Sequence, residues 1–178
     1  MNHLTRPLIA LALLALVVPA GIANAQPDAG AKMRGENNFY GSSAGSAMRS
    51  AREHSSYYRQ YAQGAPEKQI NPEVAREAAD AIGTYITKAR RHMAWMRTQA
   101  HASKDKETLA SLDVIDKNLA AAAKSHKEMH DTCLKANVDG TESMECCKQI
   151  DEPLAAAIAE HDKLMKRLAG EKGTTPKK

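Results

Sequence analysis

The stretch 106–134, KETLASLDVIDKNLAAAAKSHKEMHDTCL, decides the fold of this chain. A helix turns about 100° per residue, so side chains three and four residues apart lie on one face. One face of this stretch is apolar along most of its length, and its members are Leu112, Ile115, Leu119, Ala122, Met129 and Cys133. Such a row predicts an amphipathic helix that buries this face against other helices.

Two further helices have clear sequence boundaries. Asn71-Pro72-Glu73 combines an N-cap residue, a proline at the first helical position and an acid in the first turn, and predicts a helix from there to about residue 102. Ser103 is the expected cap of the next helix, which runs to about Leu134. An earlier helix is predicted over residues 42–63 and ends at Gly64.

The remaining segments complete a small all-α protein. Residues 135–151 contain Asp139-Gly140 and are predicted to be a loop, and a fourth helix is expected from near Pro153 to Gly170. No segment alternates with period two, so no sheet is expected. The sequence predicts an antiparallel up-down-up-down four-helix bundle. Its expected divisions are a signal peptide at 1–25, a flexible leader at 26–41, the bundle at 42–170 and a disordered tail at 171–178.

The first 25 residues have the features of a secretory signal peptide. Arg6 supplies the positive charge, residues 8–18 form an apolar run too short to span a membrane, and Ala23-Asn24-Ala25 is a small-residue cleavage pattern. We expect cleavage before Gln26 and a periplasmic or extracellular protein with no transmembrane segment in the mature chain. The net charge of +4 comes from interspersed residues of both signs, so no nucleic-acid partner is expected.

Most histidines fall on or near the apolar rows of the predicted helices. His126 and His130 are four residues apart, which is the spacing of a chelating pair. Reflecting residue numbers about the predicted turns, the third of them near residue 143, puts His54, His126 and His161 at one level of the bundle, with His130 one turn away. A buried imidazole needs a hydrogen-bond partner or a metal. The four histidines are therefore expected to converge on a site for zinc, copper or iron, or for non-covalent haem.

Other features narrow the chemistry. His92 and Met96 lie one turn apart and form a secondary candidate for a metal, copper above all, although methionines at this spacing also fill cores. No Cys-x-x-Cys-His motif is present, which excludes covalent haem attachment. No nucleophile with a base, carboxylate pair or phosphate loop is evident, so a binding protein is predicted and not an enzyme.

The alternative function is a structural or interaction bundle that holds no ligand, in which the histidines bond to each other, to a tyrosine hydroxyl or to water. In the predicted layout neither outer helix reaches the tip of the central hairpin, roughly residues 93–115. An apolar face left uncovered there predicts a homodimer contact or another protein partner. The residues of this expected contact are Met93, Met96, Leu109, Leu112 and Ile115.

The three cysteines generate the first testable prediction. An exported protein meets oxidising conditions, and adjacent cysteines rarely bond to each other, so Cys133 is expected to pair with Cys146 or Cys147. Closing a loop of this size stabilises the fold by about 3 kcal/mol, less any strain. Mass mapping of non-reduced protein from the periplasm should find one such bridge, and three free thiols there would refute it.

Overall fold

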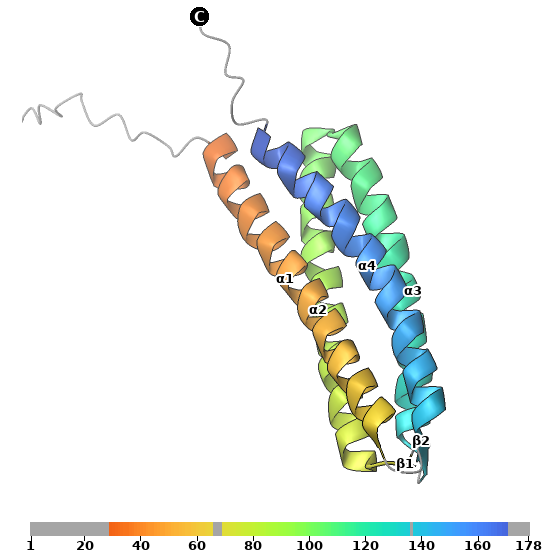
Figure 1. Ribbon diagram of the computed structural model, residues 1–178. Coiled ribbons are helices and arrows are strands. Elements are labelled where there is room, and N and C mark those ends of the chain that lie inside the picture. Colours follow the sequence, from red (N-terminus) through yellow and green to blue (C-terminus); the bar gives the residue numbers. More distant parts are fainter. Residues whose placement is uncertain (1–28, 66–68, 136, 171–178) are drawn as a thin grey trace, which may run out of the picture.

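The computed structural model describes residues 29–65, 69–135 and 137–170, which form four long helices packed against each other (Figure 1). The predicted signal peptide, the first residues of the predicted leader and the predicted tail lie outside these residues. Within them, no helix is long and apolar enough to cross a membrane. The elements are α1 (Ala29–Gly64), β1 (Gln69–Ile70), α2 (Pro72–Ser103), α3 (Lys106–Cys133), β2 (Val138–Asp139) and α4 (Gly140–Gly170).

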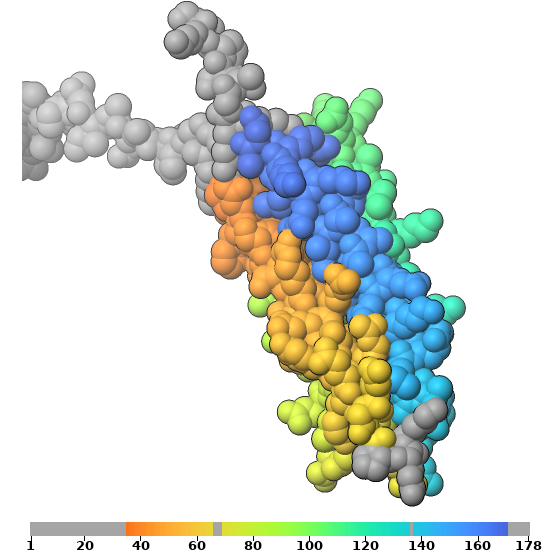
Figure 2. Space-filling view, viewed as in Figure 1, coloured from red at the N-terminus to blue at the C-terminus, as the bar shows by residue number. Residues whose placement is uncertain are grey.

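The chain reverses direction at both ends of the helical stack (Figure 1). The short strands β1 and β2 pair antiparallel at one end, where Ile70 lies opposite Val138. The connection from α2 to α3 lies at the other end, beside the start of α1 and the end of α4. Helices α1 and α4 lie side by side along one face (Figure 2), where Arg59 and Asp151 form an ion pair with a 3.1 Å N···O distance.

The boundaries of α2 and α3 follow from local chemistry. Asn71 caps α2 as predicted, because its side-chain oxygen accepts a hydrogen bond from the backbone N–H of Glu73 at 2.9 Å. Asp105, and not Ser103, caps α3, because the Asp105 carboxylate accepts the N–H of Thr108 at 2.9 Å. Lys104 joins the two helices in a left-handed conformation with φ of 57°.

The flexible leader predicted at 26–41 is wrong from Ala29 onward, because α1 begins there. Glycine, asparagine and serine lower the helix propensity of this segment, but packing outweighs them. Tyr40 stacks on Trp95 of α2 with ring centroids 4.1 Å apart, and Ala44 and Met48 are fully buried.

The fourth helix also begins earlier than predicted. Asp139 caps α4, because its carboxylate accepts the N–H groups of Thr141 at 2.7 Å and Glu142 at 2.9 Å. Asp139-Gly140 is therefore a helix start and not part of a loop. Pro153, near which this helix was expected to begin, lies inside it.

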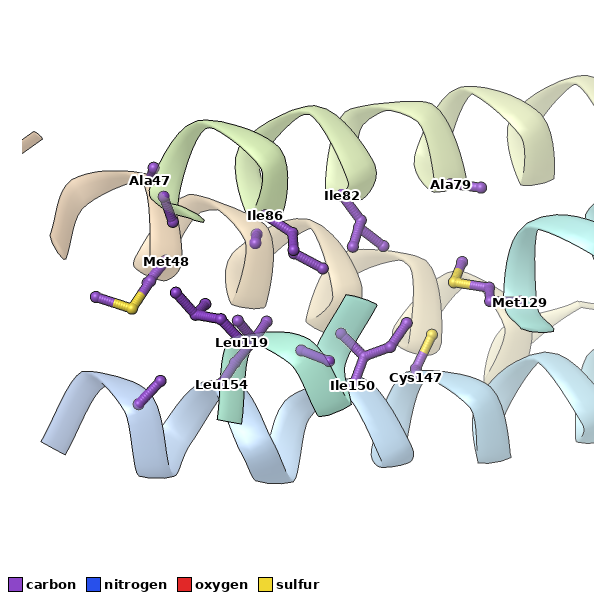
Figure 3. Close-up of a cluster of buried hydrophobic side chains, with 14 of the residues drawn as sticks. Ala47, Met48, Ala79, Ile82, Ile86, Leu119, Met129, Cys147, Ile150 and Leu154 are labelled. Atoms are coloured by element: carbon purple, nitrogen blue, oxygen red, sulfur yellow. The ribbon is translucent and has the colours of Figure 1, made fainter. Parts of the chain in front are cut away.

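These two longer helices cover the tip of the central hairpin. Met93, Met96, Leu112 and Ile115 are at most 1 % exposed, and Leu109 is half-buried against the core. The uncovered apolar face that predicted a partner contact at these residues is therefore absent from the structure of the single chain. They belong to a continuous core to which all four helices contribute, as Ile82, Leu119, Met48 and Ile150 illustrate (Figure 3).

Candidate functional site

The four histidines predicted to share one site do not converge: His126 and His130 are neighbours, whereas His54 and His161 lie elsewhere. No group of three or more His, Cys, Asp or Glu side chains able to hold a metal occurs within the described residues. The prediction that His161 lies at the level of His126 is wrong because it misplaced the turn between α3 and α4. Arg167 of α4 donates to the Thr108 hydroxyl of α3 at 2.8 Å, so this hairpin turns near residue 137 and not near 143. His161 consequently lies far along the stack from His126.

His126 is bound to the backbone of the neighbouring helix. Its Nε2 lies 2.8 Å from the carbonyl oxygen of Ala79, and since a carbonyl only accepts, Nε2 carries the proton. The ring lies over Gly83, where a Cβ atom would be 2.5 Å from the His126 Cε1. Cβ atoms tilt toward the helix N-terminus, so a larger residue at 83 would cover the carbonyl of residue 79. The absence of a side chain at Gly83 thus leaves room for the imidazole to reach the Ala79 carbonyl.

His161 repeats the same arrangement between α4 and α1. Its Nε2 donates to the carbonyl oxygen of Gly41 at 2.8 Å, and a Cβ at Gly45 would be 2.6 Å from its Cε1. The side chain is 3 % exposed, and its Nδ1 lies 3.4 Å from the carboxylate of Asp162, which also binds Arg49. His161 and His126 are packing residues in this structure, with one ring nitrogen each committed to a helix.

His130 lies beside His126 on α3, as the spacing predicted. Their ring centroids are 6.1 Å apart, and His130 Nε2 is 3.6 Å from a carboxylate oxygen of Asp80. Asp80, His126 and His130 line an open groove between α2 and α3. The chelating spacing is present, but His126 is held by Ala79.

His54 occupies a different surface, a groove of about 320 Å³ between α1 and α2. Its Nδ1 donates to the carbonyl oxygen of Ser50 at 2.9 Å, which leaves Nε2 as the nitrogen with the free lone pair. Its ring packs against Tyr85 with centroids 5.2 Å apart. We call this surface the tyrosine groove, and its lining residues are His54, Tyr57, Tyr58, Tyr61, Val74, Glu77, Ala78 and Ala81.

Each tyrosine of the groove is anchored by its hydroxyl. Tyr58 donates to the Ser143 hydroxyl at 3.1 Å, and burial raises its pKa. Tyr57 donates to Glu53 at 2.8 Å, and this bond raises its pKa. Tyr61 accepts the N–H of Asn71 at 3.2 Å. The rings are therefore held in place, while Tyr57 remains 60 % and Tyr61 39 % exposed.

The secondary candidate, His92 with Met96, lies in the interior. Met96 is a core residue, and His92 is 7 % exposed and packs edge-on against Tyr40 at 5.4 Å. The His92 Nδ1 is buried and has no hydrogen-bond partner in the described part of the chain. Burial lowers the pKa of His92, and the nearby charges of Arg91 and Lys88 lower it further.

The three cysteines gather where α3 ends and α4 begins. All three are free thiols in this structure. The Cys133 sulfur lies 3.8 Å from the Tyr58 hydroxyl, and burial raises the pKa of Cys133 and raises that of Cys147 to about 12. The bridge from Cys133 to Cys146 or Cys147 stays a prediction, now between two helices and not between a helix and a loop.

The tyrosine groove is the site that sequence reasoning missed. Tyr57, Tyr58 and Tyr61 were visible as a cluster next to His54, since residues three and four apart share a helix face. Their partners Val74 and Ala78 come from α2 and carry no local signal. Comparisons with protein-family models, with curated proteins and with solved structures found no match.

The contact of His126 with Gly83 generates a stability prediction. Gly83→Ala should destabilise the protein by about 1–2 kcal/mol in urea unfolding, because the new Cβ displaces the imidazole and breaks its bond to Ala79. Gly35→Ala is the matched control. Gly35 has nothing within 4 Å, so this change should be neutral or stabilising by up to about 1 kcal/mol. Equal effects of both substitutions would contradict the packing role of His126.

His92 generates a pH prediction. Its folded-state pKa is lowered, so the folded protein takes up this proton less readily than the unfolded chain, whose histidines titrate near about 6.5. The contribution of His92 to stability is complete above that pH and falls as the pH drops below it. Chemical unfolding at pH 7.5 and pH 5.5 should show a smaller loss for His92→Phe than for the unmodified protein. The control His101→Phe, at an exposed position, should lose as much stability between pH 7.5 and pH 5.5 as the unmodified protein does.

Proposed function

We propose that this chain is an exported up-down-up-down four-helix bundle that binds haem non-covalently in the tyrosine groove, with His54 as the iron ligand. The observation that carries the proposal is the hydrogen bond from His54 Nδ1 to the Ser50 carbonyl beside an anchored aromatic wall. Export rests on the predicted signal peptide. The protein is proposed to bind its ligand and not to transform it.

The number of protein ligands favours haem over a bare ion. Zinc and similar ions take three or four ligands from the protein, and the described residues offer no such group. In haem the porphyrin supplies four nitrogens, so one imidazole from the protein is enough to hold the iron. Of the ligands expected from the histidine pattern, haem is the one that a single available histidine can bind.

The hydrogen bonding of His54 suits this role. Histidines that bind metals usually donate their other ring N–H to a carbonyl or carboxylate, which fixes the ring and raises its basicity. His54 has this arrangement with Ser50. His126 and His161 also donate to a backbone carbonyl, but their rings lie against Gly83 and Gly45 of the neighbouring helices, so His54 is the better candidate.

The surroundings of His54 suit a flat apolar ligand. Aromatic rings stack on planar π-systems, and Tyr57, Tyr61 and Val74 are three of the exposed large hydrophobic residues in the described part of the chain. The groove is at the small end of the range for ligand pockets, which is about 300–1,000 Å³. It would therefore grip one edge and one face of a porphyrin and leave the rest in solvent.

A haem titration followed by visible absorption tests this proposal. The unmodified protein should give a saturable shift of the Soret band with one haem per chain. His54→Ala should weaken haem binding by at least about tenfold, since even the outer partners of metal ligands are worth about 10–100-fold in affinity. His101→Ala, a change of an exposed histidine elsewhere on α2, should leave the titration unchanged.

Two further measurements separate ligation from stacking. Metal-free protoporphyrin should bind equally well to the unmodified protein and to His54→Ala. Tyr57→Ala should weaken the binding of both haem and metal-free protoporphyrin. Circular dichroism confirms that each variant is folded. If His130→Ala abolishes the Soret shift and His54→Ala does not, the haem lies in the groove between α2 and α3, and the assignment to His54 is wrong.

A further inference from the structure

The outer surface between α2 and α3 contains a long polar groove. Two adjoining hollows of about 570 and 670 Å³ share Thr87, Arg90 and Arg91 as lining residues. Small side chains keep the groove open, namely Ala94 on α2 and Ala120 and Ala123 on α3. Between Gly83 and Ala94 the helix rises about 16 Å. We call this surface the basic groove.

The cationic side chains of the basic groove have no acidic partner in the described part of the chain. Lys88, Arg90, Arg91 and Lys117 line it and form no ion pair with any described residue. This contrasts with Arg49, Arg59 and Arg97, each of which binds a carboxylate. The groove thus holds an excess of positive charge that no ion pair within the described residues neutralises.

The two acids in the groove do not cancel this charge. Asp116 is held by the guanidinium of Arg97 at 3.0 and 2.6 Å, so its charge is already paired. Asp80 lies at one end, 3.6 Å from His130. The positive potential also reaches the neighbouring interior, since Lys88 and Arg91 both lower the pKa of His92.

We propose that the basic groove binds an elongated small-molecule polyanion, whose acidic groups reach the cations of both hollows. The donors present are suited to oxyanions: guanidinium groups bind phosphate or carboxylate through two parallel hydrogen bonds, and Thr84 and Thr87 add hydroxyls. An elongated ligand fits because the groove consists of two adjoining hollows: Arg90 and Arg91 border both, Lys88 borders the first and Lys117 borders the second. This site lies on another side of α2 from the tyrosine groove and does not depend on the haem proposal.

Binding of linear tripolyphosphate, measured by isothermal titration calorimetry on the purified protein, tests this inference. The unmodified protein should bind it saturably at low salt. Inorganic phosphate and the compact trianion citrate should each bind at least about tenfold more weakly, because neither is long enough to reach the cations of both hollows. Citrate binding as tight as tripolyphosphate would overturn the elongated ligand.

Matched variants assign the site. Lys88→Gln with Arg91→Gln should weaken tripolyphosphate binding by about tenfold or more, since each substitution removes a charge-assisted hydrogen bond to the anion. Arg52→Gln with Lys148→Gln removes the same charges from exposed positions on α1 and α4 and should leave the affinity nearly unchanged. Equal weakening by both pairs would show attraction to net charge alone and overturn the site, as would the absence of saturable binding to the unmodified protein.

Discussion

The close approach of a histidine ring to the backbone of a neighbouring helix organises this protein. It occurs twice, where His126 meets Ala79 and Gly83, and where His161 meets Gly41. In each case the carbonyl that accepts the imidazole proton is four residues before a glycine, and it also belongs to the hydrogen-bond ladder of its own helix. The glycine lets α3 approach α2 and α4 approach α1, and the histidine supplies both volume and a polar contact in the gap.

This packing explains why a histidine-rich sequence does not build a four-histidine centre. A buried imidazole needs a partner, and a backbone carbonyl on another helix meets that need as well as a metal does. His126 and His161 are consumed in this way, which leaves His54 and His130 at the edges of two surface grooves. The candidate ligand-binding histidines therefore lie in surface grooves and not in the interior of the protein.

Much of the fold could be predicted because its signals are local. The Asn71 cap and the apolar row of α3 depend on neighbours within one or two turns. Because the α2–α3 connection is short, reflecting residue numbers about it puts His126 opposite about residue 80, and in the structure His126 bonds to Ala79. The prediction of where α4 begins was wrong because the sequence Asp139-Gly140 fits a loop and a helix cap equally well. That error moved the hairpin centre by several residues, and a helix turns about 100° for each one, so the level of His161 was lost.

The sites themselves could be predicted only in part, because a groove is made by two helices at once. The tyrosine groove needs Ala78 and Ala81 of α2 beside the rings of α1, and the basic groove needs Ala120 and Ala123 of α3 beside the cations of α2. In one helix alone these alanines are indistinguishable from core alanines such as Ala79. Helix α2 thus borders the tyrosine groove on the side toward α1 and the basic groove on the side toward α3. The proposed haem would stack on the aromatic rings of the first groove, and the proposed polyanion would meet its counter-charges in the second, so the two proposals place different ligands on two sides of one helix.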